Sequence, residues 1–94
     1  MALAFEWDSR KERVNQWKHG VSFAEARTVF DDSLAKIFDD RDHSEVEARE
    51  LIVGHSIAGN LLVVSFTERI PNRVRIINAR EVTRIEKKEF EEAG

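Results

Sequence analysis

Asn60-Leu-Leu-Val-Val-Ser-Phe-Thr67 is the stretch around which the rest of this chain is organised. It is apolar at both odd and even positions, which is typical of a strand covered on both faces and therefore of a central strand. The preceding stretch, Arg49 to Ser56, also has a strand pattern, and Ile57-Ala58-Gly59 between the two predicts a hairpin. An antiparallel pair is therefore expected at the centre of a sheet.

The remaining predicted elements surround this hairpin. Further strands are expected at 3–7, 34–38 and 73–80, from short apolar or alternating runs bounded by polar residues. Helices are expected at 9–19, 22–30 and 81–92, the first between an N-cap at Asp8 and a C-cap at Gly20. The order β-α-α-β-β-β-β-α predicts an α+β domain, in which a small antiparallel sheet is backed by helices on one side.

The helices carry more specific expectations. Ser22 and Glu25 have the spacing of a capping box. The first helix has a thin apolar face, Val14 and Trp17, by which it is expected to pack. The residues expected to point inward from the last helix are Val82, Ile85 and Phe90.

Length and composition exclude several classes of protein. The 94 residues suit one domain, 1–94, and the absence of cysteine excludes a disulfide framework, a thiolate zinc site and a cysteine nucleophile. No apolar run approaches the ~18–20 residues that span a bilayer. The start of the chain lacks the basic and apolar segments of a signal peptide, so a cytoplasmic protein is expected.

Charge is distributed unevenly along the chain. The 15 basic and 18 acidic residues give a net charge of −3, which by itself argues against a nucleic-acid binder. Residues 31–50 hold eight acids and three bases, whereas residues 69–88 hold seven bases and two acids. This asymmetry indicates either an oriented field, with a salt-dependent affinity for RNA at the basic segment, or two solvated faces of opposite sign.

Short motifs in a shared order resemble the BrnT family of bacterial toxins. They are Phe5-Glu-Trp-Asp8, Lys18-His-Gly-Val-Ser-Phe23, Val29-Phe-Asp31, Asp42-His-Ser44, Thr67-Glu-Arg69, Arg75-Ile-Ile77, Ala79-Arg80 and a Glu-rich last helix. The resemblance implies a RelE-like fold and a ribonuclease toxin of a type II toxin–antitoxin pair. It further implies RNA cleavage without a metal or other cofactor, neutralisation by a BrnA-like antitoxin, and contact with promoter DNA only through that antitoxin. No membrane partner is expected.

Two other functions stay open. The same fold could be a catalytically silent module that docks a partner or acts as a transcriptional corepressor, which the net acidity favours. It could also be a toxin that blocks translation by binding without cleavage.

Metal-free RNA cleavage requires a cation at the phosphate and a base for the ribose 2′-OH. Arg75 and Arg80 are the first candidates for the cation, because a guanidinium group binds two phosphate oxygens at once. A regular strand puts them on opposite faces, so they converge only across a bulge or if Arg80 lies past the strand end; an ion pair with an acid is the alternative. Glu68 is the candidate base, or an ion-pair partner of a nearby arginine, and Arg49 could reach the same edge, or be a rim charge.

Contact with RNA is expected from a second set of residues: Lys18, His19, Arg69 and Arg73. His19 also stands where it could interact with the free carbonyls at a helix end. Trp7 and Trp17 are interpreted as core residues, with base stacking as the alternative.

The other histidines are given structural interpretations. His43 is interpreted as a tether of an acidic loop, and His55 as a partly buried, hydrogen-bonded strand residue. The histidines and neighbouring aspartates have no recognised metal-ligand spacing, so no metal site is expected.

Overall fold

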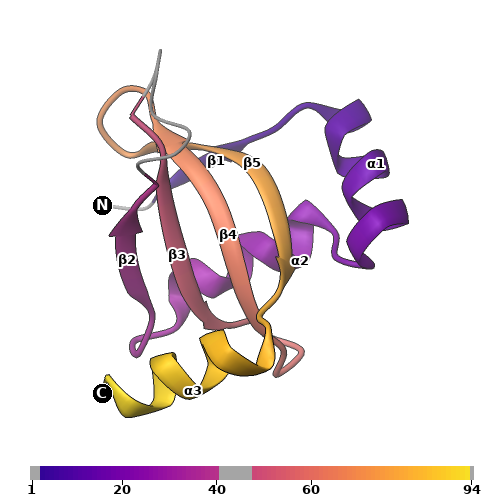
Figure 1. The fold of residues 1–94 in the computed structure, drawn as a ribbon. Coiled ribbons are helices and arrows are strands. Elements are labelled where there is room, and N and C mark those ends of the chain that lie inside the picture. The colour runs from indigo at the N-terminus through magenta and orange to yellow at the C-terminus, as the bar shows by residue number, and fades with distance from the viewer. Residues whose placement is uncertain (1–2, 41–47, 94) are drawn as a thin grey trace.

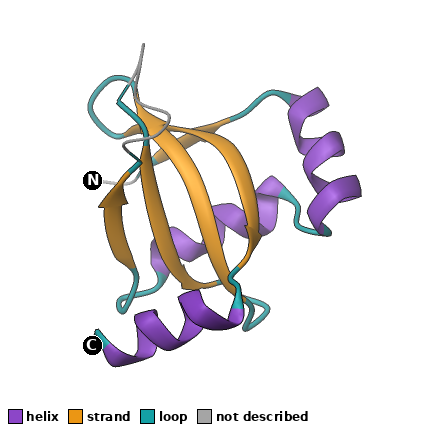
Figure 2. Ribbon diagram, viewed as in Figure 1, coloured by secondary structure: helices purple, strands orange, loops and turns teal. Residues whose placement is uncertain are grey.

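The computed structural model describes residues 3–40 and 48–93, whose fold is drawn in Figures 1 and 2. Within these residues five strands form one sheet, in the order β1-β5-β4-β3-β2. The strands are β1 (Ala4–Glu6), β2 (Lys36–Asp39), β3 (Glu50–His55), β4 (Leu61–Glu68) and β5 (Arg73–Glu81). The helices are α1 (Ser9–His19), α2 (Phe23–Thr28), which continues as a 3-10 turn η1 (Val29–Asp31), and α3 (Arg84–Glu92).

The central hairpin is confirmed. β3 and β4 pair antiparallel with Val53 opposite Val63, and β4 lies in the middle of the sheet. The α+β prediction is also confirmed, with one difference in the sheet: β1 runs parallel to β5, in the register Phe5 to Val74. The pairing partner of a strand of three residues cannot be read from its own pattern, because so short a run lacks a register signal.

The helix ends follow the predicted caps. The Asp8 carboxylate accepts hydrogen bonds from the backbone N–H groups of Arg10 (2.8 Å) and Lys11 (3.3 Å), and these bonds lower its pKa. Gly20 ends α1 with a φ of 70°, a left-handed conformation that suits glycine.

The capping box expected at the start of α2 is only half present. Ser22 Oγ accepts from the backbone N–H of Glu25 (3.0 Å). The Glu25 carboxylate instead accepts from Ser56 Oγ (2.7 Å) and Asn60 Nδ2 (2.9 Å), so it fastens the β3–β4 turn to α2. The complete capping box is at α3, between Thr83 and Glu86.

The core lies between the sheet and α2, which crosses behind the strands in Figure 1. Phe23, Ala26 and Val29 are fully buried there against Leu62 and Val64 of β4. Most of the stabilising apolar burial is therefore on this face.

The bulge in β5 changes which residues face the core. Ser65 lies opposite Asn78 and Phe66 opposite Ile76, which leaves Ile77 as the extra residue. Before the bulge the buried positions are even-numbered, as at Ile76, and after it they are odd-numbered, as at Ala79.

α3 lies at the lower end of the sheet, over the face opposite α2 (Figure 1). Glu89 and Phe90 of this helix border a hollow together with Leu51, Val53 and Val63. The expectation that the helices lie on one side is therefore not met by α3. β5 also extends to Glu81, so this helix starts three residues later than predicted.

The inward face expected for the last helix is only partly right. Phe90 is half-buried, with its ring centroid 5.9 Å from that of His55 and 5.3 Å from Lys36 Nζ. Val82 precedes the helix and is half-buried. Ile85 is 70% exposed, which corrects the prediction for that residue.

Candidate active site

The face of the sheet opposite α2, here called the open face, carries side chains from the three longest strands. Across β3, β4 and β5, Leu51, Ser65 and Asn78 form one row, and Val53, Val63 and Arg80 form the next. All of these residues except Val53 border a hollow of about 530 Å³. Its lining residues are Lys11, Asp40, Arg49, Leu51, Val63, Ser65, Ile77, Asn78 and Arg80.

The bulge brings Arg80 to this hollow. Arg75 lies opposite Thr67 and Arg80 opposite Val63, and both partners are odd-numbered residues of β4 that share the open face. The sequence predicted that these two arginines converge only across a bulge or if Arg80 lies past the strand end. Arg80 lies within β5, and the bulge at Ile77 puts both residues on one face.

Each of these two arginines is held by a carboxylate. Arg80 donates from Nη1 to Glu86 Oε1 (2.7 Å) and from Nη2 to Glu86 Oε2 (2.9 Å), a bidentate pair. The hydrogen bonds to Arg80 lower the pKa of Glu86 to about 2, and the same pairing raises the pKa of Arg80. Arg75 donates from Nη1 to Glu6 Oε2 (2.9 Å). The ion-pair alternative is thus realised for both, and Arg75 does not line the hollow with Arg80.

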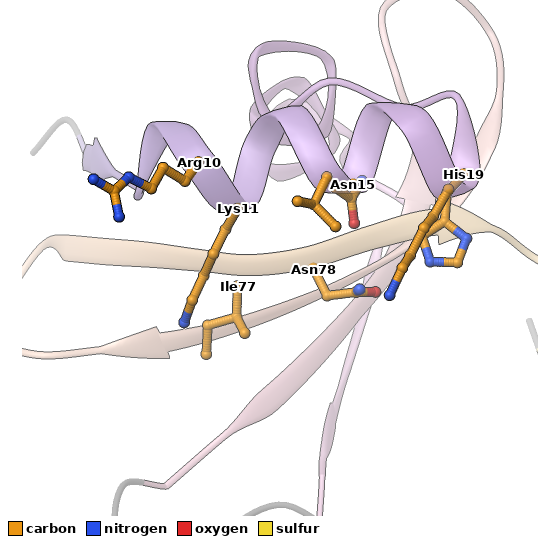
Figure 3. A pocket seen from close by; sticks show the side chains of 8 residues that line it. Arg10, Lys11, Asn15, His19, Ile77 and Asn78 are labelled. Atoms are coloured by element: carbon orange, nitrogen blue, oxygen red, sulfur yellow. The ribbon is translucent and has the colours of Figure 1, made fainter.

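A second hollow, of about 290 Å³, lies between α1 and β5 and is shown in Figure 3. Lys11, Ile77 and Asn78 border both hollows, so the two adjoin. In Figure 3 the side chain of Lys11 extends from α1 across β5 toward Ile77. We call the two hollows together the cationic groove; its cationic residues are Arg10, Lys11, Lys18, Arg49 and Arg80, with His19 at one end.

Asn15 fixes α1 beside the groove. It is 4% exposed, and its side-chain amide donates to the carbonyls of Ala79 (2.8 Å) and Val21 (2.9 Å) and accepts from the N–H of Ala79 (3.1 Å). The expectation that α1 packs by Val14 and Trp17 was wrong, since these side chains are 51% and 84% exposed. A polar contact with the edge of β5 replaces the apolar one.

The structure brings together half of the residues predicted for the site. Arg49 and Arg80 share the larger hollow, and Lys18 and His19 line the adjoining one. The other four are Glu68, Arg69, Arg73 and Arg75, none of which lines either hollow.

Those four residues lie toward the β4–β5 turn. Glu68 is exposed at the end of β4, opposite Val74 and thus on the face covered by α2. Arg73 is exposed, with Nη1 3.7 Å from Glu6, and the Arg69 backbone N–H donates to the Arg73 carbonyl (3.1 Å).

Sequence reasoning missed Arg10, Lys11, Ser65 and Asn78. The helical spacing of Arg10, Lys11 and Lys18, seven or eight residues apart, places them on one face of α1 and could have indicated a cationic stripe. Nothing in the sequence shows that this stripe faces Asn78.

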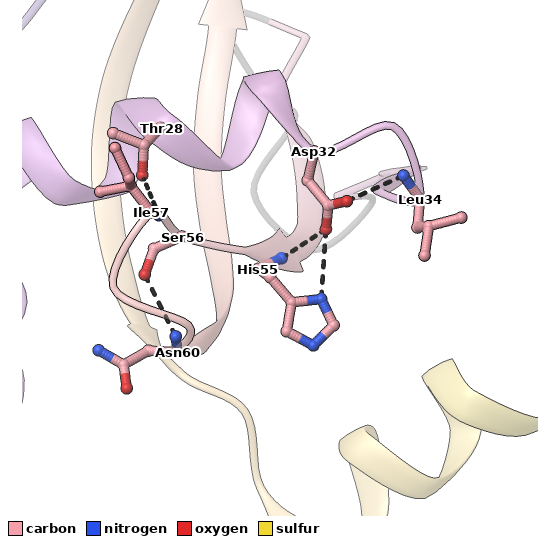
Figure 4. A network of polar contacts seen from close by, with 7 residues as sticks. All are labelled: Thr28, Asp32, Leu34, His55, Ser56, Ile57 and Asn60. Atoms are coloured by element: carbon pink, nitrogen blue, oxygen red, sulfur yellow. Dashed lines mark hydrogen bonds and ion pairs between the residues drawn. The ribbon is translucent and has the colours of Figure 1, made fainter.

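Asp32 and His55 form a separate network, shown in Figure 4. Asp32 accepts from the backbone N–H of His55 (2.7 Å) and of Leu34 (2.9 Å), and these bonds lower its pKa. His55 Nδ1 lies 3.3 Å from Asp32 Oδ2. The hydrogen-bonded interpretation of His55 is confirmed, although its side chain is 49% exposed, and the network ties η1 to the end of β3. His43 lies outside the described residues.

Neither a metal-binding cluster nor a membrane-spanning helix is found in the described part of the chain. Within residues 3–40 and 48–93, no group of three or more acidic or histidine side chains could hold a metal ion. No described helix has the length and apolar content that crossing a membrane requires.

Comparison with known proteins identifies the family. A family model described as ribonuclease toxin, BrnT, of type II toxin-antitoxin system matches residues 7–86. The chain is also similar to the crystal structure of the Brucella abortus ribonuclease toxin BrnT, with a TM-score of 0.67 and 21% identity over 88% of this chain and 100% of that one. No curated protein matches the chain. The structural likeness shows the shared fold, and because the family model covers most of the sequence, the chain belongs to the BrnT family of ribonuclease toxins of type II toxin–antitoxin systems.

Proposed function

We propose that the chain is an endoribonuclease that cleaves RNA in the larger hollow of the cationic groove, without a metal ion. The observation that carries the proposal is the placement of Arg49 and Arg80 around one hollow on the open face. Two guanidinium groups there supply the positive charge that the phosphorane-like transition state needs. The polar side chains of Ser65 and Asn78 between them can orient the ribose and phosphate.

The proposed reaction is attack of the ribose 2′-OH on the adjacent phosphorus. A bond forms between the 2′-oxygen and phosphorus, and the bond between phosphorus and the 5′-oxygen of the next nucleotide breaks. The 2′-OH loses its proton to a base, the 5′-oxygen gains one, and the products are a 2′,3′-cyclic phosphate and a 5′-OH. Asp40, whose carboxylate borders the hollow, is the proposed base, and Lys11, which also borders it, is the proposed acid for the leaving oxygen.

The ion pair between Arg80 and Glu86 bears on how phosphate is bound. Glu86 occupies both terminal nitrogens of Arg80, so a phosphate must share or displace this carboxylate. Arg75 and Glu68, also predicted to be catalytic, remain predictions, and they would act on RNA beyond the hollow.

Cleavage of total RNA by the purified chain in excess chelator tests the proposal. We expect fragments ending in 2′,3′-cyclic phosphate. We also expect the cleavage rate to fall at least about 100-fold in Arg49→Ala and in Arg80→Ala, which is the usual effect of removing one group that stabilises the charge of a transition state. Arg84→Ala, at an exposed arginine of α3, is the matched control and should leave the rate unchanged. Activity that disappears with chelator, or that survives both substitutions, would overturn the assignment.

A BrnA-like antitoxin is the proposed partner, and promoter DNA is reached only through it. The support is the family, whose toxins belong to type II pairs. In the cytoplasm, where RNA and antitoxin are present, expression of the chain should arrest growth, and co-expression of the antitoxin should restore it. If RNA stays intact while the antitoxin still binds tightly, the silent-module alternative holds instead.

A further inference from the structure

Trp17 is the most exposed aromatic side chain in the described part of the molecule, at 84%. The core interpretation holds for Trp7, which packs edge-to-face on Phe23 with centroids 6.2 Å apart, but it is wrong for Trp17. An exposed indole leaves a large apolar area in contact with water, where it contributes nothing to the core. Single exposed apolar residues are nevertheless common, so exposure alone does not indicate a function. The side chains around Trp17 therefore have to show whether it binds a ligand.

The side chains around Trp17 are cationic. Arg10 and Arg13 lie seven and four residues before Trp17, on the same face of α1, and Lys18 is the next residue along the chain; all three are exposed. None of these three makes an ion pair with any described residue. Glu12, the acid of this helix, faces inward instead, and its Oε2 accepts from the backbone N–H of Phe23 (2.9 Å).

This combination fits a single-stranded nucleic acid. Such strands bind to surfaces that offer positive charge to the phosphates and an aromatic face to the bases. A protein partner would also bury an exposed tryptophan. The four cations of α1, Arg10, Lys11, Arg13 and Lys18, outnumber the two nearby acids, Asp8 and Glu12, whose carboxylates accept backbone hydrogen bonds, and this excess of positive charge favours a polyanion.

The position of α1 connects Trp17 to the proposed active site. Val14, one helical turn before Trp17, lines the smaller hollow with Arg10 and Lys18. That hollow adjoins the larger one, since Lys11 and Asn78 line both. An RNA strand that has its scissile phosphate between Arg49 and Arg80 can therefore continue along α1 to its outer face.

We propose that Trp17 forms a base-stacking subsite for single-stranded RNA, flanked by Arg10, Arg13 and Lys18. Stacking tolerates any base, so this subsite adds affinity for longer strands without specifying their sequence. The path of the RNA from the larger hollow to Trp17 rests on the proposed function. Binding at Trp17 can nevertheless be tested without any cleavage.

The probe is a fluorescein-labelled single-stranded 2′-deoxy oligonucleotide, which lacks the attacking hydroxyl. Removing the stacked indole should weaken binding of the whole protein about 5- to 100-fold in Trp17→Ala, and Trp17→Phe should retain most of the affinity. Gln16→Ala, at an exposed neighbour on the same helix, is the matched control and should bind as the wild type does.

A second readout uses the same oligonucleotide without the dye and reports contact with the base. In Trp7→Phe the chain keeps one tryptophan, Trp17, so its fluorescence should be quenched when the oligonucleotide binds. Unchanged affinity in Trp17→Ala would overturn the proposal, and so would the absence of quenching. Weaker antitoxin binding with unchanged oligonucleotide binding would overturn it too, in favour of a protein interface. Binding that depends on Trp17 in a protein that cleaves no RNA would support the subsite and reject the nuclease.

Discussion

The side-chain amide of Asn15 pairs with both backbone groups of Ala79, as a neighbouring strand would. It donates to the Ala79 carbonyl (2.8 Å) and accepts from its N–H (3.1 Å). β1 pairs with β5 only as far as Arg75, so the edge of β5 beyond that point needs another partner. The side chain of Asn15 thus satisfies the backbone groups of Ala79 at the edge of the sheet. It also holds α1 at a fixed distance from Asn78 across the cationic groove.

Asn15→Ala should destabilise the fold strongly. It leaves the N–H and carbonyl of buried Ala79, and the carbonyl of Val21, without this partner. We expect a loss of about 3 kcal/mol in the free energy of unfolding, measured by urea denaturation, because unsatisfied buried groups are costly. Gln16→Ala, at the exposed next position, should change it by less than about 0.5 kcal/mol. Similar losses for the two variants would show that the amide is not what holds α1.

Gly54 of β3 packs closely against Val29 of η1 and against Ala35, just before β2. A Cβ there would be 2.8 Å from Ala35 Cβ and 3.1 Å from Val29 Cγ1, which is too close for either to remain in place. Gly54→Ala should therefore cost about 2 kcal/mol of stability in thermal or urea unfolding, as overpacked cores do. Ala35→Gly in the same chain removes the nearest atom and should recover part of that loss. If the double variant is no more stable than Gly54→Ala alone, the steric explanation fails.

The fold was largely predictable because its elements carry local signals. Apolar positions on both faces placed β4 at the centre, and Asp8 and Gly20 marked the two ends of α1 where the structure has them. These signals act within a few residues of one another, so they can be read along the chain.

The candidate site was only half predictable because it depends on tertiary geometry. Arg80 reaches the open face because Ile77 is an extra residue, and no pattern in β5 identifies which residue bulges. Lys11 faces the groove because Asn15 binds Ala79, a contact between residues 64 positions apart. The exposure of Trp17 follows from the same contact, since a polar residue packs α1 where apolar ones were expected.

Acid should weaken the contact between β5 and α3. The pKa of Glu86 falls from its ordinary value of 4.5 to about 2, chiefly through its hydrogen bonds with Arg80. A lowered pKa in the folded state contributes stability above about pH 4.5, and this contribution is lost as the pH falls from there toward 2. We expect a loss of about 1 kcal/mol from this group, discounted for solvent screening because its side chain is 35% exposed.

Urea denaturation at neutral and acidic pH measures this loss. Glu86→Gln keeps a side chain that can still accept from the Thr83 N–H, and it should reduce the difference in stability between the two conditions. Glu91→Gln, at an exposed acid of the same helix, should leave the difference as it is in the wild type. An equal reduction in both variants would indicate net charge, rather than the pair with Arg80, as the cause.

Thr67 should tolerate the loss of its hydroxyl. The side chain is 2% exposed, and its Oγ1 has no hydrogen-bond partner among the described residues. Thr67→Val has nearly the same shape and removes this buried polar atom, so we expect a gain of about 1 kcal/mol in urea denaturation. Thr28→Val is the contrasting variant, because Thr28 Oγ1 donates to the Glu25 carbonyl (2.6 Å) and accepts from the Ile57 N–H (2.9 Å). It should lose stability, and a loss in Thr67→Val as well would reveal a partner for that hydroxyl.

Lys11 should contribute to RNA affinity although its sequence context did not indicate it. Its side chain borders both hollows of the cationic groove, so a strand bound in either hollow lies near its ammonium group. For a single strand, each phosphate that a cation no longer neutralises lowers the slope of log affinity against log salt by about 0.7. We therefore expect Lys11→Ala to bind a labelled single strand more weakly at low salt and to show a shallower salt dependence by about that amount.

Lys88→Ala, at an exposed lysine of α3 that borders neither hollow, removes the same charge and should leave the slope unchanged. Equal slopes for the two variants would mean that net charge alone draws RNA to the protein and that the groove is not its path.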